Sequence, residues 1–503
     1  MSFLLGLFKK EKMNNKYIVF FIYFILGIIF NWYFFLEHFS IDSYPFLYFQ
    51  EKNGIAIIGT GRALYGFILN ILAKSSYFVV EHQFIMMLIS VFSLALSAAI
   101  LYFVNVELIY KISNVRNHKL IKSASFLASY LIVFNAFQSS MAPFIEMFPG
   151  SSIALLLVAT AVKKLINKKI KSSIVLVIIS MFIYQAWVAL YIAYFFIVLL
   201  ELFKKRFLYS LVSAGMAYFF VIVVNYYVSS FLVYLFDLPK WRIGGLNFSR
   251  IILQFKFIPQ HIFDILTHSY NFLPKNYLFF TTFIFCIIFL FELFKIKNKK
   301  QFNILIVIFL IFYVLPLIPT LVADNSYITI RMVMVIPSIV GFLIFLYFLY
   351  FGNKKYLSYM VLLMGFFSSM VFLRLSLVEG RNMLDVNKVD ERDVVFINNI
   401  IKQEEEKNNV VVKYVSFVKD RNITVCRTNK CFPSISESFF IADWANEAGF
   451  NYYSKKNFNR TYEKIMSENL DSEEVKKNNL SDFKYMSKEE VIVKDDKVLI
   501  VIY

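Results

Sequence analysis

The sequence predicts a polytopic α-helical membrane protein with about 11 transmembrane helices and a small C-terminal α/β extracytoplasmic domain. Apolar residues make up 59% of the 503 residues and charged residues only 17%, against about 25% in an ordinary soluble domain. Long apolar runs recur along most of the chain, and short clusters of Lys and Arg separate them. This composition excludes a soluble enzyme, a disordered chain and a disulfide scaffold.

Eleven apolar runs are predicted to cross the bilayer. Each is close to the roughly 20 residues that a helix needs to span a hydrocarbon core about 30 Å thick. The runs lie near residues 17–36, 84–104, 123–138, 150–163, 172–184, 186–203, 207–229, 277–294, 302–320, 332–351 and 356–375. The stretch 172–203 is too long for one helix and short for two, so we divide it at Tyr184-Gln185.

The distribution of charge predicts the orientation. Residues 374–503 hold 21 Lys+Arg and 22 Asp+Glu, whereas residues 1–373 hold 31 and 12. The positive charge therefore belongs to the membrane part, where it marks topology, and we expect no nucleic-acid partner. The clusters alternate between the apolar runs, and the positive-inside rule places the N-terminus inside and the C-terminus outside. We expect a multi-pass protein of the cytoplasmic (inner) membrane.

Two domains follow from this topology. The first is a transmembrane domain, residues 1–375, with outer loops at 37–83 and 230–276. The second is the extracytoplasmic domain, residues 376–503. A helix is predicted from Asp390 to Glu406, because apolar residues recur there at helical spacing. Strands are predicted at Val410–Val418, Ile423–Arg427 and Val491–Tyr503, the last with a turn at Asp495-Asp496.

Charged residues at the outer ends of the spans are the candidate site residues. A charge near a bilayer is energetically costly, so its presence there indicates a function. Asp42 follows the first span and suits a general base that faces a membrane-bound substrate. Arg62 follows Gly59-Thr60-Gly61 and begins an apolar run, where its guanidinium could bind a lipid phosphate. The alternative is an interfacial helix with a snorkelling Arg62 and a solvated Asp42.

Two more outer segments carry candidates. Glu146 is an acid in the turn between Pro143 and Pro149, and it is either a second carboxylate of the site or a solvated turn residue. Tyr184 and Gln185 lie at the outer end of a short span. Their polar groups could orient a substrate hydroxyl, but position alone favours a tyrosine of the interfacial aromatic belt.

Arg331 begins the predicted tenth span. At the start of a helix it could bind phosphate with help from the helix dipole, or it could form a surface salt bridge with Asp324. The long outer loop contains further basic residues among apolar ones, which an amphipathic segment lying on the membrane explains. These residues are Lys240, Trp241, Arg242, Arg250 and Lys256.

Cysteine and histidine positions argue against a metal centre. Cys426 and Cys431 lie in the predicted outer domain and could form a disulfide. A structural zinc site needs four ligands, and all five histidines lie outside that domain. No metal site is predicted. No chain of ionisable residues runs through the middle of the spans, which argues against the hypothesis of an ion-coupled transporter.

Taken together, these residues resemble the Gtr-type glucosyltransferase family. This family belongs to the GT-C superfamily of polyprenyl-phosphate-sugar-dependent membrane glycosyltransferases, and it is known from O-antigen serotype conversion. The resemblance rests on Asp42 before Gly61-Arg62, on the run ending in Ile183-Tyr184-Gln185, on Arg331, and on Arg381–Ile401 with Asp390 and Asp393. The family often has paired acids in the first outer loop. Here Ser43 follows Asp42, so the second acid is Glu37, Glu146 or absent.

The resemblance implies a GT-C-like fold and a transfer reaction on the outer leaflet. A hexose, in this family glucose, would pass from a polyprenyl-phosphate donor to a cell-surface polysaccharide or lipid-linked glycan acceptor. A polyprenyl-phosphate sugar synthase and a small flippase would supply the donor. The inner loops are too short to hold a nucleotide-sugar domain, which independently favours a lipid-borne donor. No cofactor is required, although a divalent metal stays open.

We therefore expect Asp42 and Glu146 to be catalytic, and Arg62, Tyr184, Gln185 and Arg331 to bind substrate. Two other classes stay open at this point. One is a lipid-linked glycan polymerase or ligase, which also has many spans and large outer loops. The other is a lipid or glycan transporter.

Overall fold

The computed structural model describes most of the chain and is mostly helical in the part that it describes. The described residues are 13–48, 50–113, 115, 117–237, 256–269, 272–296, 299–318, 330–353, 355–419, 438–441, 445–456, 459–460, 491–494 and 497–502. Within them, six helices are long and apolar enough to cross a membrane. These are Gln83–Ile112, Phe148–Ile166, Gln185–Leu202, Phe207–Leu235, Lys300–Leu317 and Tyr356–Asn408.

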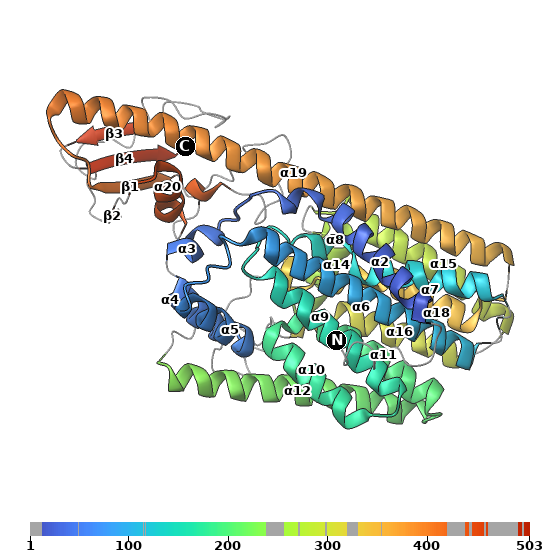
Figure 1. Cartoon of the computed structure of the whole chain (residues 1–503). Coiled ribbons are helices and arrows are strands. Elements are labelled where there is room, and N and C mark those ends of the chain that lie inside the picture. The colour runs from blue at the N-terminus through green and yellow to red at the C-terminus, as the bar shows by residue number, and fades with distance from the viewer. Residues whose placement is uncertain are drawn as a thin grey trace.

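The helices pack side by side into an elongated bundle (Figure 1). Its main helices are α2 (Met13–Phe30), α6 (Gln83–Ile112), α7 (His118–Val133), α9 (Phe148–Ile166), α10 (Ile170–Ile183), α11 (Val188–Ile197), α12 (Phe207–Leu235), α15 (Tyr277–Ile296), α16 (Lys299–Tyr313) and α18 (Ser338–Tyr350). Short helices connect them: η1 (Trp32–Phe35), α3 (Ser43–Tyr48), α4 (Gln50–Ile58), α5 (Ala63–Lys74), α8 (Ala136–Ser139), η2 (Gln185–Trp187), η3 (Val198–Leu202), α14 (Ile258–Thr267), η5 (Leu315–Leu317) and η6 (Ile330–Met332).

Each of the eleven predicted runs overlaps a helix of this bundle, but several of these helices are short. α10 has 14 residues, α18 has 13 and α7 has 16. The helical membrane architecture is therefore supported, whereas the number of eleven spans stays a prediction. The predicted division at Tyr184-Gln185 is confirmed, because α10 ends at Ile183 and Tyr184 is extended, with φ −158° and ψ 115°.

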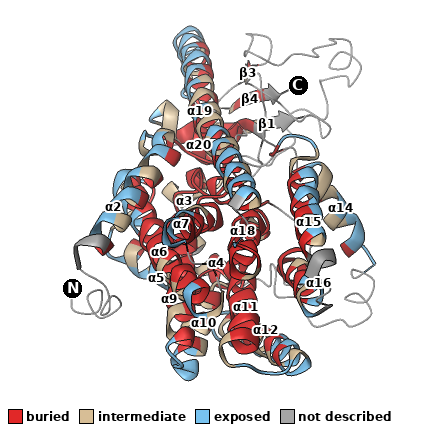
Figure 2. Cartoon of the chain, turned by 90° about the vertical axis from the view of Figure 1, so that its right-hand side faces the viewer, coloured by how far each residue is buried: buried red, intermediate tan, exposed pale blue. Residues whose placement is uncertain are grey.

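Burial separates the helices at the centre of the bundle from those at its surface (Figure 2). The segment Gln185–Leu202 is 89% buried in its apolar window, whereas Phe207–Leu235 is only 22% buried. α12 exposes large apolar side chains, among them Phe219, Phe231 and Tyr234. Such an apolar surface is unfavourable in water and suits contact with lipid.

One helix joins the bundle to the C-terminal sheet. α19 (Lys355–Asn408) has 54 residues, which corresponds to a length of about 80 Å. It lies along the bundle and continues beyond it to the sheet (Figure 1). The predicted boundary at 375/376 falls inside α19, so the last predicted span and the predicted helix Asp390–Glu406 are parts of one helix.

A four-stranded sheet and α20 (Asn446–Ser454) pack near the end of α19. The strands are β1 (Tyr414–Lys419), β2 (Asn459–Arg460), β3 (Val491–Lys494) and β4 (Lys497–Ile502), in the order β2-β1-β4-β3. β1 is parallel to β2 and β4, and β3 is antiparallel to β4. Two predicted strand regions are thus present. The region 423–427, the turn at 495–496, Cys426 and Cys431 lie outside the described residues, and an independent α/β domain stays a prediction.

Hydrogen bonds fasten the first outer segment to α19 and α20. Asn387 on α19 accepts from the backbone N–H of Phe39 at 2.8 Å and donates to its carbonyl at 2.9 Å. The hydroxyls of Tyr44 in α3 and Tyr453 in α20 lie 2.9 Å apart. Asp390 accepts from the hydroxyl of Ser438 at 2.6 Å, next to η7 (Phe439–Ile441). These contacts hold residues 38–44 in place over one end of the bundle.

Candidate active site

Asp42 and Arg331 form an ion pair at that end of the bundle. Asp42 lies immediately before α3, where a turn closed by a bond from the Ser43 N–H to the Ser40 carbonyl presents its side chain. Arg331 donates from one terminal guanidinium nitrogen to the Asp42 carboxylate at 3.3 Å. The same guanidinium lies 3.7 Å from the centre of the Phe144 ring. The Arg331 side chain is 21% exposed and the Asp42 side chain 36%, so the pair faces solvent on one side.

The expectation that Arg331 begins a helix is wrong. Arg331 lies in η6, and α18 begins only at Ser338, after Pro337. A proline disfavours helical geometry in the residue before it, which explains why the helix starts after Pro337. Arg331 therefore lies seven positions before α18, away from the dipole at its N-terminus. Asp324, its predicted surface partner, lies outside the described residues.

Glu146 is fully buried, and the interpretation as a solvated turn acid is therefore wrong. The Ser43 hydroxyl donates to Oε2 of Glu146 at 3.1 Å. The Tyr65 hydroxyl in α5 donates to the Glu146 carbonyl at 2.7 Å, which fixes the backbone of this turn. Oε1 of Glu146 is buried without a hydrogen-bond partner among the described residues.

The environment of Glu146 changes its protonation. Burial and the nearby negative charge of Asp42 raise its pKa from 4.5 to about 8, against the opposing effects of the Ser43 hydroxyl and the Arg331 cation. Glu146 is therefore mostly protonated at neutral pH. A protonated carboxyl carries an O–H and can donate a hydrogen bond as well as accept one.

Arg62, Tyr184 and Gln185 form the second half of the site. The Arg62 guanidinium lies 4.4 Å from the centre of the Tyr184 ring, and the Tyr184 hydroxyl donates to the Arg331 carbonyl at 3.0 Å. Tyr184 is only 2% exposed, so it does not belong to an interfacial aromatic belt. The Gln185 amide donates to the Gly61 carbonyl at 2.6 Å. Gly61 has φ +83°, a conformation that suits glycine.

All six predicted site residues thus lie in one connected set of contacts. Two carboxylates occupy unlike environments, one partly exposed and one fully buried. Two guanidiniums lie over aromatic rings. Arg331 pairs with Asp42, and Arg62 lies over Tyr184, whose hydroxyl donates to the Arg331 carbonyl. Such an arrangement can bind a phosphate through the guanidiniums and remove a proton through the exposed carboxylate.

Three residues of this set were not predicted from sequence. Ser43 links Asp42 to Glu146, Tyr65 fixes the Glu146 backbone, and Phe144 lies beneath Arg331. Of the three, only Ser43 could have been suspected from the sequence, because it is adjacent to Asp42. Phe144 is one of 60 phenylalanines, and nothing in its sequence context distinguishes it.

The remaining candidates contribute less to this site. Glu37 does not provide the second carboxylate, because its side chain accepts from Tyr452 at 2.8 Å in a separate cleft. Lys256 is exposed just before α14, whereas residues 240, 241, 242 and 250 lie outside the described residues. Among the residues that the structure describes, no group of three or more His, Cys, Asp or Glu side chains could hold a metal ion.

Comparisons with protein-family models, with curated proteins and with solved structures give no match to this chain.

Proposed function

We propose that the protein is a membrane glycosyltransferase of the GT-C type, which moves a hexose, in the first instance glucose, from a polyprenyl-phosphate donor to a glycan acceptor. One observation carries the proposal. The partly exposed carboxylate of Asp42, the buried carboxyl of Glu146 and the guanidinium of Arg331 lie together at one end of an apolar helical bundle, and Arg62 is linked to them through Tyr184. Acid–base chemistry on a lipid-borne phosphate substrate needs these groups together.

The donor phosphate binds the guanidiniums of Arg62 and Arg331. Both guanidiniums lie over aromatic rings, which limit their motion and leave their edges to donate hydrogen bonds. Arg331 donates to Asp42 in the structure, so an arriving phosphate competes with Asp42 for this cation. When Arg331 turns to the phosphate, the Asp42 carboxylate is released to act as a base.

The reaction is a substitution at the anomeric carbon. The acceptor oxygen forms a bond to this carbon while the bond from the carbon to the phosphate oxygen breaks. Asp42 takes the proton of the acceptor hydroxyl, an effect worth typically about 10²- to 10⁴-fold in rate. Polyprenyl phosphate leaves with the bonding electron pair, and Arg62 and Arg331 stabilise its negative charge. Gln185 orients a hydroxyl of the transferred sugar, and buried Glu146 accepts from the Ser43 hydroxyl and so holds the turn that carries Asp42.

The proposal includes the cellular setting. In this proposal eleven spans leave the two termini on opposite sides of the inner membrane, and the basic loops assign the N-terminus to the inside, so that the site faces the outer side. A polyprenyl-phosphate sugar synthase and a small flippase supply the donor, and the acceptor is a cell-surface polysaccharide such as an O-antigen. Five segments support this arrangement, since the first outer loop, Glu146, Tyr184, Arg331 and Asn387 are all predicted outside and meet at one end of the bundle.

The donor requirement tests the proposal. Purified full-length protein in lipid is incubated with radiolabelled polyprenyl-phosphate glucose and lipid-linked glycans from the host, and with a panel of other polyprenyl-phosphate sugars. We expect transfer of one hexose from a monophosphate donor. Transfer that depends on an oligosaccharide diphosphate lipid would instead indicate a polymerase or ligase. Movement of lipid across the bilayer without any new glycosidic bond would indicate a transporter, and either result would contradict the proposal.

A further inference from the structure

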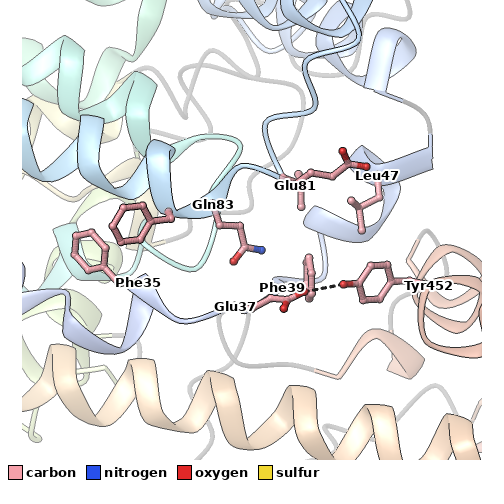
Figure 3. A pocket seen from close by; sticks show the side chains of 9 residues that line it. Phe35, Glu37, Phe39, Leu47, Glu81, Gln83 and Tyr452 are labelled. Atoms are coloured by element: carbon pink, nitrogen blue, oxygen red, sulfur yellow. Dashed lines mark hydrogen bonds between the residues drawn. The ribbon is translucent and has the colours of Figure 1, made fainter.

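A cleft of about 620 Å³ lies between the first outer segment, the start of α6 and α20 (Figure 3). Its apolar lining comes from Phe35, Phe39, Leu47, Val80 and Phe84, and its polar lining from Glu37, Glu81, Gln83 and Tyr452. The cleft is thus open to ligands that present both an apolar face and hydrogen-bonding groups.

The charge of the cleft differs from that of the candidate active site. It is lined by two carboxylates, Glu37 and Glu81, and no Lys or Arg is among the described residues that line it. In Figure 3 these two glutamates lie on opposite sides of the cleft, with Gln83 between them. Ionised carboxylates accept hydrogen bonds and cannot donate them. One cation lies near the lining, because the Lys455 ammonium is 4.4 Å from the centre of the Tyr452 ring, but the two carboxylates outnumber it. The cleft therefore favours ligands rich in hydroxyl donors over ligands that carry acidic groups.

The backbone around the cleft is held by side-chain amides. Gln83 accepts from the N–H of His38 at 3.0 Å and also donates to the His38 carbonyl. Asn387 makes the corresponding pair of bonds with Phe39. Glu37 accepts from the Tyr452 hydroxyl at 2.8 Å, which connects the cleft to α20. Polar groups fixed in this way bind a ligand with little loss of conformational entropy.

The rim of the cleft reaches an apolar surface. Phe84 is 61% exposed. Trp32, three residues before Phe35, and Leu36, directly after it, are 58% and 51% exposed. Aromatic residues with this exposure are typical of the interface between lipid and water. The opposite wall belongs to α20, beyond the bundle. A glycan attached to a lipid would leave the membrane at this level.

We propose that this cleft binds the acceptor glycan, through a sugar unit with free hydroxyls and no acidic group, and that Glu37 and Glu81 exclude anionic sugars. The inference rests on the proposed function. Asp42 lies five positions after Glu37, so their Cα atoms lie at most about 18 Å apart. A short oligosaccharide held in the cleft can therefore present its terminal hydroxyl to Asp42. The aromatic side chains stack on the apolar faces of the sugar rings.

Binding of soluble oligosaccharides tests this assignment without a donor. The probes are a neutral hexose trisaccharide and the matching trisaccharide in which one unit is a uronic acid. Full-length protein in nanodiscs is titrated with each, and binding is followed by saturation-transfer NMR. We expect the neutral probe to bind at least about tenfold more tightly, which corresponds to roughly 1.4 kcal/mol. Equal binding of the two probes, or no binding of the neutral one, would overturn the proposal.

Variants test whether the probes bind in the cleft or elsewhere on the protein. Glu81→Lys replaces an exposed side chain, and it should remove or reverse the preference for the neutral probe. Leu47→Trp fills the cleft and should abolish binding of both probes. Glu391→Lys, at an exposed position on α19 outside the cleft, is the matched control and should bind like the wild type. A Glu81→Lys variant with the wild-type preference would contradict the role of Glu81.

The same variants distinguish a failure of this inference from a failure of the proposed function. If transfer occurs and the acceptor KM is unchanged in Leu47→Trp, the cleft is not the acceptor site and the glycosyltransferase proposal stands. If the neutral trisaccharide binds as expected and no polyprenyl-phosphate sugar supports transfer, the cleft still binds glycan and the proposed function is wrong.

Discussion

Asp42 and Glu146 carry the same functional group in two different environments. Asp42 is partly exposed and paired with Arg331, whereas Glu146 is buried and accepts from the neutral hydroxyl of Ser43. When two neighbouring carboxyl groups differ in this way, one serves as a base and the other as a hydrogen-bond donor. At the scale of single residues, the difference between Asp42 and Glu146 therefore depends on the protonation of Glu146.

Replacing Glu146 with glutamine should change how stability depends on pH. The pKa of Glu146 rises from 4.5 in the unfolded chain to about 8 in the folded protein, so the native state keeps a proton that the unfolded state has lost between these values. Stability therefore falls as the pH rises through this window. Glu146→Gln cannot titrate, and its apparent melting temperature should fall less between pH 4.5 and 8 than that of the wild type. Identical pH profiles would show that folding does not raise the pKa of Glu146.

At the scale of elements, the junction between α5 and α10 determines the geometry of the site. α10 ends just before Tyr184, and Gly61 lies just before Arg62. The bond from Gln185 to the Gly61 carbonyl joins the two chain segments. The positions of the Arg62 guanidinium and the Tyr184 ring thus depend on the backbone at Gly61.

Substitution of Gly61 by alanine should disturb this junction. A Cβ at Gly61 would lie 2.9 Å from the amide nitrogen of Gln185, and φ +83° costs a residue other than glycine about 1–2 kcal/mol. We expect Gly61→Ala to lower both the apparent melting temperature and the transfer rate. Gly215→Ala is the matched control, because a Cβ there meets no atom within 4 Å and alanine is the better residue inside a helix. Equal melting temperatures and transfer rates in the two variants would show that the backbone at Gly61 does not determine the geometry of the site.

At the scale of the whole molecule, topology can be measured by labelling single cysteines. Cys286, Cys426 and Cys431 are first replaced by serine. Gln403→Cys on α19 and Asn167→Cys after α9 both occupy exposed positions. With the N-terminus inside, an impermeant maleimide should label Gln403→Cys in cells with a permeable outer envelope and intact inner membrane. It should label Asn167→Cys only after the inner membrane is opened. The reverse pattern would invert the orientation and place the candidate site inside.

The sequence was sufficient for much of the helical architecture, because both helix length and loop charge are constrained by the bilayer. The six candidate residues that it singled out also lie together in the structure, since charges and polar groups near apolar runs are few; their role in a site stays a prediction. It did not predict the ion pair of Asp42 with Arg331, which joins residues 289 positions apart. The continuity of α19 was missed because hydropathy reports the surroundings of a segment and not whether its backbone stays helical. The burial of Glu146 depends on Ser43 and Tyr65, which distant parts of the chain contribute.

In the proposed reaction Asp42 removes the proton of the acceptor, and Asp42→Asn takes away this capacity alone. Asparagine keeps the shape of the side chain and still accepts from Arg331, but it cannot take up a proton. The control is Asp385→Asn, at a half-exposed carboxylate on α19 that lies 3.9 Å from Arg381. Transfer of radiolabelled hexose by the folded, reconstituted protein should fall by about 10²- to 10⁴-fold in Asp42→Asn and stay at the wild-type rate in Asp385→Asn. Wild-type transfer by Asp42→Asn would contradict the account.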